Sequence, residues 1–432
     1  MKLSEKFIRL GLILLIALSL YFSYVIWLSP SNRTVHEQTM NQVIATQNYR
    51  KASDVFMPLS VSWIDGEDIQ QTTSETLISE LQPLITSAKI EKLATTTYDS
   101  FDEFQEQADI QRGIELDYVG PFSLQEYLTM FDLNSSEKSA DGYFTKVQLD
   151  FEQKEIRFIN VKRYQITKAA MAFDQTDFQE VLEQAKTTWT AMTKENRLQN
   201  LQFNLKEPVK MKMYSYISSS QAYTVFRDAF FKDAADVKSN EDSQDVVLYD
   251  GSENMTIQQE QQLVDFRGEL LPDEDSTDIY SQSFHFISRL GTNLGNVRFF
   301  DRSKDTANYR IFVEGFPVFS EDIRGEINLT ISEDKSGDGL PVHIQTSLNT
   351  IQVPIPSEEE IELANNETII DQILAAGGNR EQIRSMIIGY QWQDIKDTNG
   401  VVDLVPTWYI KYDETWYPYK KLVTQLSETE AE

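Results

Sequence analysis

The side chains best suited to catalysis or metal binding are few in this sequence and lie far apart. There is no cysteine, and the three histidines are His36, His285 and His343. None of them belongs to an H-E-x-x-H motif, and no G-x-S-x-G motif provides a serine nucleophile. His285 lies in an apolar run that predicts a helix, where we expect it to pack. We therefore predict no catalytic residue, no cofactor and no metal, and a protein that is not an enzyme.

One short segment imitates a metal site. Residues 334–339 (DKSGDG) have the spacing of the first half of an EF-hand calcium loop. The twelfth position is Gln345, where the loop needs a bidentate glutamate, and strand-like runs lie on both sides. The segment therefore predicts a hairpin turn.

Aromatic residues in two C-terminal segments could form a binding surface. The segments are 309–319 (YRIFVEGFPVF) and 406–419 (PTWYIKYDETWYPY), and both alternate as strands do. Such alternation favours cross-strand packing, and a carbohydrate or partner platform is the alternative. The candidate ectodomain interface residues are Phe316, Phe319, Trp408 and Trp416.

The first 28 residues contain the most informative segment. Residues 10–28 (LGLILLIALSLYFSYVIWL) carry no charge, and as a helix they would span about 28 Å, close to the core of a bilayer. Lys2, Lys6 and Arg9 precede the segment, so we expect the N-terminus in the cytoplasm and the rest of the chain outside the cell. A cleaved signal peptide is the alternative, but the apolar run is long and no A-x-A site follows it.

The membrane segment could also bind another helix. Ser19 and Ser23 form a small-xxx-small pair, with Gly11 nearby, and small residues let helices approach closely in lipid. The candidate partner-helix residues are Gly11, Leu15, Ser19, Ser23 and Trp27.

The overall charge limits the possible partners. The formal net charge of the 432 residues is −29. Nucleic acid is excluded, because binding to phosphates needs clustered Lys and Arg. An exported chain without cysteine must be held by its cores alone, which suits the exterior of a Gram-positive cell.

Hydrophobic periodicity predicts an α+β fold, in which antiparallel sheets carry helices packed on one face. Helices are expected at 74–85, 100–108, 123–131, 177–193 and 224–234, and a hairpin at 143–160. A helix, a strand and an aromatic hairpin occur at 279–319 and again at 367–419, as a weak internal repeat. The predicted parts are a cytoplasmic leader (1–9), a transmembrane helix (10–28), a juxtamembrane connector (29–53), an N-terminal α+β ectodomain (54–200), a central small α+β domain (201–276), a C-terminal domain of two helix-plus-sheet units (277–426) and a disordered tail (427–432).

The chain resembles the YycH (WalH) family of regulatory proteins from Gram-positive bacteria. The resemblance rests on the span that ends in Tyr24–Pro30, on the 309–319 segment and on the strand 406–412 (PTWYIKY). It implies a role in a membrane complex with the WalK (YycG) sensor histidine kinase and a sibling protein, YycI, whose ectodomain resembles the C-terminal domain. Such a complex adjusts kinase output and hence cell-wall metabolism, as a homo- or hetero-oligomer. Family members include inhibitors and activators, so the resemblance implies no sign.

Overall fold

The computed structural model describes residues 50–133, 141–195, 197–240, 245–270, 278–332, 339–395, 398 and 400–430. Within these ranges, no helix combines the length and the apolar character that crossing a membrane requires. The predicted leader, the transmembrane segment 10–28 and most of the connector lie outside the described residues. Residues 49–432 form one compact unit.

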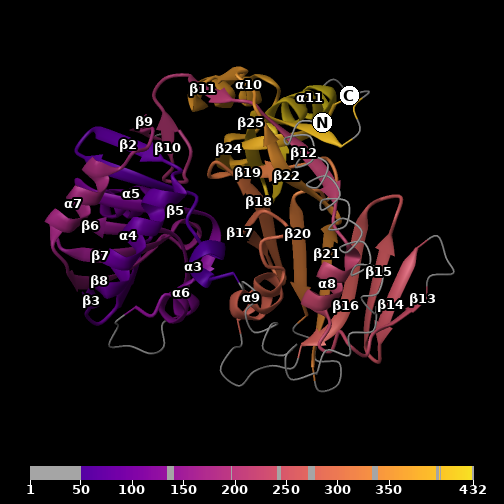
Figure 1. Ribbon diagram of the computed structural model, residues 1–432. Coiled ribbons are helices and arrows are strands. Elements are labelled where there is room, and N and C mark those ends of the chain that lie inside the picture. Colours follow the sequence, from indigo (N-terminus) through magenta and orange to yellow (C-terminus); the bar gives the residue numbers. More distant parts are fainter. Residues whose placement is uncertain are drawn as a thin grey trace, which may run out of the picture. The chain divides into compact units, whose positions relative to one another are not determined.

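The first half of this unit is built on a ten-stranded sheet, coloured indigo to magenta in Figure 1. The strand order is β10-β9-β2-β1-β5-β6-β7-β8-β3, with β4 also pairing β8, and every pair is antiparallel. The strands are β1 (Ser60–Asp65), β2 (Asp68–Thr72), β3 (Lys89–Ile90), β4 (Ala94–Thr97), β5 (Arg112–Ser123), β6 (Tyr143–Asp150), β7 (Glu155–Asn160), β8 (Gln165–Ala172), β9 (Thr190–Lys194) and β10 (Phe203–Leu205).

The helices of this half begin where the sequence predicts. Ser74, Ser100 and Ser123 each accept a hydrogen bond from the backbone N–H three residues on, which stabilises the first turn. The predicted helices near 74, 100 and 123 are therefore confirmed. The helices are α3 (Ala52–Val55), α4 (Glu75–Ser87), α5 (Phe101–Ala108), α6 (Leu124–Met130) and α7 (Gln175–Gln184).

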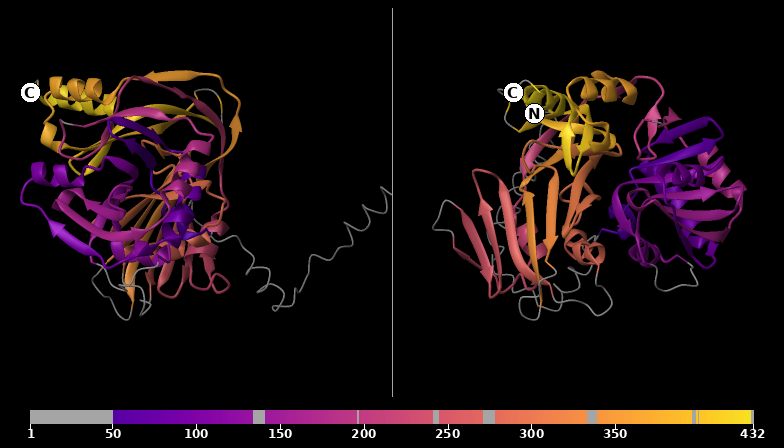
Figure 2. Two further views of the ribbon diagram at one scale, coloured as in Figure 1. Left: turned by 90° about the vertical axis from the view of Figure 1, so that its left-hand side faces the viewer. Right: turned by 180° about the vertical axis from the view of Figure 1, so that it is seen from behind.

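Helices cover both faces of the first sheet, so the predicted one-face arrangement is wrong here (Figure 2). Phe158 of β7 belongs to the main core, together with Leu81 of α4. Its neighbour Ile159 packs against Phe104 of α5 in a separate cluster. Adjacent strand residues point to opposite faces, so α4 and α5 lie on opposite sides of the sheet.

The helix predicted at 177–193 is also corrected. Helix α7 ends at Gln184, and residues 190–194 form β9, which pairs β2. Trp189, which continues the helical spacing, instead lies 6.1 Å from the ring of Trp63. Pairing with a strand that would otherwise be a sheet edge overrides the local periodicity.

The second half is built on a fourteen-stranded sheet, with one parallel pair, β19 and β24. Its order is β13-β14-β15-β16-β21-β20-β18-β19-β24-β25-β12-β22, with β17 on β18 and β26 on β25. The sheet runs across the predicted 276/277 boundary through the β16–β21 pair, and the domain boundaries themselves stay predictions. The strands are β12 (Tyr214–Ser220), β13 (Lys238–Asn240), β14 (Val246–Asp250), β15 (Glu253–Gln258), β16 (Leu263–Leu270), β17 (Asn296–Ser303), β18 (Thr306–Val313), β19 (Phe316–Phe319), β20 (Glu326–Ile331), β21 (Leu340–Ser347), β22 (Asn349–Ile355), β24 (Ile383–Asp394), β25 (Val401–Tyr412) and β26 (Thr415–Pro418), while β11 (Val209–Lys212) and β23 (Glu360–Leu363) pair separately.

The element order of the predicted internal repeat occurs twice in the second half. In the first unit α9 (Ile279–Arg289) precedes the meander β17-β18-β19, and in the second α10 (Asn366–Ala375) precedes β24-β25-β26. Each meander pairs its first strand with the second and its second with the third. The hairpin predicted at 334–339 is supported as well, because β20 and β21 pair antiparallel on both sides of it.

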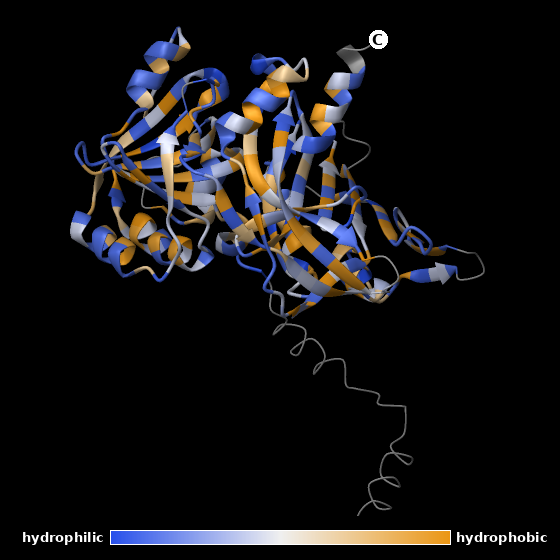
Figure 3. Cartoon of the chain, turned by 90° about the horizontal axis from the view of Figure 1, so that it is seen from above, coloured by the Kyte–Doolittle hydropathy of each residue, from blue (hydrophilic) through white to orange (hydrophobic). Residues whose placement is uncertain are grey.

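The chain ends in a helix where a disordered tail was predicted. Helix α11 (Tyr419–Glu430) continues through residues 427–430, so the prediction is wrong there, and residues 431–432 lie outside the described part. The helix shows hydrophobic and hydrophilic sides beside the C label in Figure 3. Leu422 is buried, and the contacts of this apolar side hold the helix on the core.

Helix α8 (Tyr223–Phe230) confirms the helix predicted near 224–234.

Candidate functional site

The first described residues form a wedge between the two sheets. We use this name for residues 50–58, which include α3. Phe56 is fully buried, and its ring centroid lies 5.0 Å from Phe122 of β5 and 5.9 Å from Phe299 of β17. Rings at these separations attract one another beyond their burial. The segment that directly follows the predicted connector therefore contacts both halves of the fold.

Arg50 joins the start of the wedge to the first repeat unit through two hydrogen bonds. Its backbone N–H donates to Ser288 O at 3.2 Å, and Nη2 donates to Gly295 O at 2.6 Å. Burial lowers the pKa of Arg50 to about 10, against the opposing effect of Asp54. The guanidinium remains charged at neutral pH and binds the carbonyl group of Gly295, which follows α9.

Arg298 of β17 joins the wedge to α4. Its side chain is 1% exposed; Nη1 donates to Glu75 Oε1 at 3.0 Å, and Nη2 donates to Pro58 O at 2.6 Å. Its guanidinium carbon lies 4.1 Å from the ring centroid of Phe312. Burial lowers the pKa of Arg298, and Glu75 opposes this effect. A guanidinium this enclosed depends on every one of these partners.

Asp301 links the two repeat units. Its Oδ2 accepts from Lys411 Nζ at 2.6 Å and from Trp416 Nε1 at 3.0 Å. Gly120 of β5 packs directly on Asp301, because a Cβ on that glycine would overlap the Asp301 Cα. One carboxylate thus contacts three elements: β25, β26 and β5.

A carboxyl at the junction of the two halves has an unusual acidity. Glu126 of α6 is buried, and its Oε1 accepts from Ser281 Oγ at 3.3 Å. Burial raises the pKa of Glu126 to about 7, with a further rise from Asp278. The protonation of Glu126 therefore changes near neutral pH.

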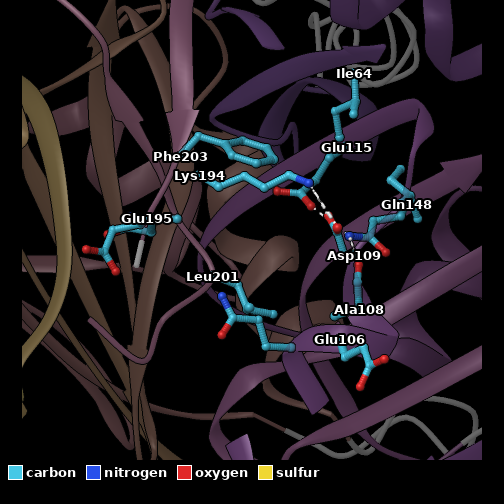
Figure 4. Close-up of a pocket in the computed structure, with 13 residues that line it drawn as sticks. Ile64, Glu106, Ala108, Asp109, Glu115, Gln148, Lys194, Glu195, Leu201 and Phe203 are labelled. Carbon is cyan, nitrogen blue, oxygen red and sulfur yellow. Dashed lines mark hydrogen bonds and ion pairs between the residues drawn. The ribbon is translucent and has the colours of Figure 1, made fainter. Parts of the chain in front are cut away.

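A cavity of about 150 Å³ lies in the first half, between α5, β5 and β9 (Figure 4). Lys194 Nζ donates to Asp109 Oδ2 at 2.9 Å at one side of it. The carboxylate of Glu195 is already bonded to the backbone N–H groups of Arg197 and Leu198. The lining residues are Ile64, Gln105, Glu106, Ala108, Asp109, Ile110, Glu115, Gln148, Lys194, Glu195, Leu201, Gln202 and Phe203.

A buried charge network supports one wall of the cavity. Lys146 Nζ donates to Glu115 Oε1 at 2.7 Å and to Asp117 Oδ2 at 2.9 Å. Burial raises the pKa of Asp117 to about 6, Lys146 opposes this rise, and Glu115 adds to it. Gln148 Nε2 donates to Glu115 Oε2 at 2.8 Å. Two carboxylates thus share a single ammonium group in the interior.

The buried side chains of this region form ion pairs and hydrogen bonds between separate elements. Within the described residues, no group of three or more His, Asp and Glu side chains could hold a metal ion. His343 Nε2 lies 2.9 Å from Asp265 Oδ2 on neighbouring strands. His285 is exposed on α9, so the packing role expected from the sequence is wrong. His36 lies outside the described residues.

The predicted interface aromatics point largely inward. Phe319 and Trp408 are buried: the Phe319 ring stacks on Tyr409 at 3.7 Å, and Trp408 Nε1 donates to Ala364 O at 2.8 Å. Phe316 and Trp416 are half-buried against Tyr390 and Phe300, respectively. These positions favour the packing interpretation. The partner-helix candidates Gly11, Leu15, Ser19, Ser23 and Trp27 lie outside the described residues.

The junction residues were missed by the sequence analysis. Arg298 binds Glu75 across 223 positions, which no local spacing reveals. A signal was nonetheless present, because Lys146, Arg298 and Arg310 each stand among apolar residues of a predicted strand. A charged residue on the buried face of a strand requires a partner, so such positions predict buried ion pairs.

Comparison with known proteins gives the family. A family model described as "YycH protein, C-terminal domain" matches residues 199–425, more than half of the chain. The fold is similar to the crystal structure of YycH from Bacillus subtilis, with a TM-score of 0.67 and 15% sequence identity over 86% of this chain and 98% of that chain. No curated protein matches the sequence. The resemblance seen in the sequence is thereby confirmed, and the chain belongs to the YycH family.

Proposed function

We propose that this protein is a membrane-anchored, non-enzymatic regulator of a WalK (YycG)-like sensor histidine kinase. It acts in a complex with a YycI-like sibling protein, and it adjusts cell-wall metabolism through the kinase. The family match over residues 199–425 carries the proposal. The uncharged segment 10–28 supports the membrane location, with the N-terminus in the cytoplasm and residues 29–432 outside.

The contacts of the wedge support coupling between the membrane segment and the fold. About twenty residues separate Leu28 from Arg50. Arg50 contacts α9, and Phe56 contacts β5 and β17. A change in the position of the wedge relative to either sheet would therefore move the connector. In this proposal, the ectodomain and the membrane helix are mechanically coupled.

The energy needed for such regulation is modest. A coupling of about 1–3 kcal/mol changes a two-state equilibrium five- to 150-fold. Contacts between helices in lipid contribute about 0.6 kcal/mol each, so a few of them suffice. Gly11, Leu15, Ser19, Ser23 and Trp27 recur every fourth residue and would share one side of a helix.

The test replaces Leu10–Leu28 by an unrelated apolar span of equal length in the native cell. We expect a several-fold change in the expression of kinase-controlled genes, in either direction, and loss of kinase and sibling from the co-purified complex. The sharper variant is Ser19→Leu with Ser23→Leu, and its matched control is Ile13→Leu with Leu20→Ile. Unchanged output and unchanged co-purification in the replacement strain would refute a role for the segment.

The alternative function, a wall-binding module built on aromatic hairpins, has less support. Phe319 and Trp408 are buried, and the cavity of about 150 Å³ is smaller than the roughly 300–1,000 Å³ of typical drug-sized ligand sites. No observation on the described surface favours a carbohydrate platform.

A further inference from the structure

Four aromatic rings of the second sheet form a row that reaches the surface. The row runs from Phe316 of β19 through Tyr390 of β24 to Tyr214 and Tyr216 of β12, with 6.1, 5.7 and 6.5 Å between successive ring centroids. Tyr390 is buried, whereas the other three side chains are half-buried. Rings in such positions present both apolar area and a π face to a partner. We call these four residues the aromatic row.

An exposed carboxylate lies beside the aromatic row. Glu314 is in the turn between β18 and β19, and it has no ion-pair partner among the residues that the structure describes. Burial raises the pKa of Tyr214 and of Tyr216, and the negative charge of Glu314 raises both further. Charges act over only about 8–10 Å at physiological salt, so the carboxylate lies close to both hydroxyl groups. The neighbouring Lys212 is opposite Glu360 of β23 and thus has a counter-charge of its own.

The turn that carries Glu314 is held in place by the first half. Thr73 Oγ1 donates to Glu314 O at 3.4 Å, and Gly315 lies so close to Thr73 that an added Cβ would overlap its backbone oxygen. The φ angle of Glu314 is +50°, in the left-handed region that residues other than glycine seldom adopt. The backbone that positions the carboxylate is therefore fixed before any partner arrives, which lowers the entropy cost of binding.

An arginine side chain is complementary to both parts of this surface. Its planar guanidinium stacks on aromatic faces and also donates two parallel hydrogen bonds to a carboxylate. The interior of the same sheet contains this combination: Arg310 Nη2 donates to Glu326 Oε2 at 2.6 Å, and its guanidinium carbon lies 4.1 Å from the ring centroid of Phe319. The net charge of −29 also attracts a basic partner.

We propose that Glu314 and the aromatic row bind an arginine side chain that a partner protein presents. The guanidinium would bond the Glu314 carboxylate and lie over the half-buried rings, so Phe316, an interface candidate from the sequence, would take part in the contact. The proposal concerns this surface alone, and it depends neither on the membrane segment nor on a kinase.

The test is ligand-observed NMR of the full-length protein in detergent micelles, with the peptide acetyl-Gly-Arg-Gly-amide as the probe. The same peptide with citrulline keeps the planar shape but has no charge. We expect a dissociation constant of about 1–10 mM for the arginine peptide, which is reasonable for a single side chain, and binding at least fivefold weaker for the citrulline peptide. Equal binding of the two peptides, or binding of neither, would overturn the proposal. Equal binding of a lysine peptide would overturn the assignment to arginine.

Variants locate the binding. Glu314→Gln keeps the size of an exposed side chain, and it should weaken binding of the arginine peptide at least fivefold. Glu67→Gln, at an exposed glutamate in the turn between β1 and β2, is the matched control and should change binding less than 1.5-fold.

The ring contribution is tested at Tyr216. Tyr216→Leu should weaken binding of the arginine peptide at least threefold, whereas Tyr216→Phe keeps a ring and should bind within twofold of wild type. A thermal transition like that of wild type shows that each variant is folded. Wild-type affinity in a folded Glu314→Gln or Tyr216→Leu variant would refute the assignment.

Discussion

The two repeat units of the second sheet have the same connectivity but bury different kinds of side chain. The first unit (279–319) buries three charged residues, Arg298, Asp301 and Arg310. The second unit (366–418) buries no charged side chain among its described residues; its core residues include Ile370, Ile373 and Trp408. The same topology therefore serves two purposes.

The partners of the buried charges explain the difference. Arg298 binds Glu75 of the first half, Asp301 binds Lys411 of the second unit, and Arg310 Nη2 donates to Glu326 of β20 at 2.6 Å. A buried ion pair adds little net stability compared with apolar packing, but losing one partner is costly. The first unit therefore fixes how its neighbours pack on it, whereas the second unit mainly fills a core.

The largest expected effect comes from Arg298→Met. The variant leaves Pro58 O without its donor and removes the ring contact with Phe312, so we expect a loss of about 3–5 kcal/mol in the free energy of unfolding. Urea-induced unfolding followed by tryptophan fluorescence measures it. The control is Arg197→Met, whose pair with Asp371 is exposed and should contribute less than about 1 kcal/mol. Equal losses of unfolding free energy in the two variants would show that the junction charge contributes no more than the surface charge.

Gly315→Ala tests the turn by which the first unit contacts the first half. Gly315 has φ +80°, and an added Cβ would overlap the backbone oxygen of Thr73. We expect a loss of about 2–4 kcal/mol, measured in the same way. Gly66→Ala is the matched control: φ is +64° and nothing lies within 4 Å, so only about 1 kcal/mol of backbone strain should appear. Similar values for both variants would show that the contact with Thr73 contributes nothing.

Asp301→Asn tests the link between the two units. The ammonium of Lys411 would keep an amide oxygen but lose its buried counter-charge, with only the exposed Glu414 left at 3.8 Å, and we expect a loss of about 1–3 kcal/mol. Asp403→Asn, within the second unit, is the comparison. Asp403 accepts from Ser215 Oγ at 2.6 Å, and an amide oxygen can still accept, so the loss should stay below about 1 kcal/mol. A larger effect at Asp403 would contradict the assignment of the junction to the first unit.

The smallest effect is the pH dependence at Glu126. Its pKa rises from 4.5 to about 7 on folding, so the folded protein holds a proton that the unfolded chain has already released. Stability therefore decreases as the pH rises from about 4.5 to 7. We expect wild type to lose about 1–2 kcal/mol more than Glu126→Gln between pH 5 and pH 8. Parallel pH profiles of the two proteins would show that the Glu126 carboxyl does not titrate in this range.

Local signals in the sequence were sufficient for most helices and strands. Ser74, Ser100 and Ser123 mark helix starts because a serine side chain bonds a free N–H of the first turn. The alternation in 143–160 gives the β6–β7 hairpin with the predicted bounds. These signals depend only on neighbouring residues, and tertiary contacts did not oppose them.

The end of α7, the cavity and the junction depend on contacts between residues that are distant in the sequence. Residues 185–189 keep helical spacing, yet α7 ends at Gln184 because β2 takes β9 as a partner. The cavity joins Glu115, Gln148 and Phe203 from three separate strands, and the junction joins Glu75 to Arg298. Sequence spacing identified none of these sets, since each side chain alone is an ordinary one.

The position of β25 in the second sheet has a consequence for the order of folding. This strand lies between β24 and β12, and its Leu404 pairs with Tyr214, 190 residues earlier. During synthesis, β12 and β24 are therefore complete while the strand that joins them is still missing. Contacts so distant in sequence form slowly. Until β25 is present, β12 and β24 have unpaired edges that can pair with other chains. Of these three strands β25 is synthesised last, so it completes this part of the sheet, and a chain that stops before residue 401 lacks the strand between β24 and β12.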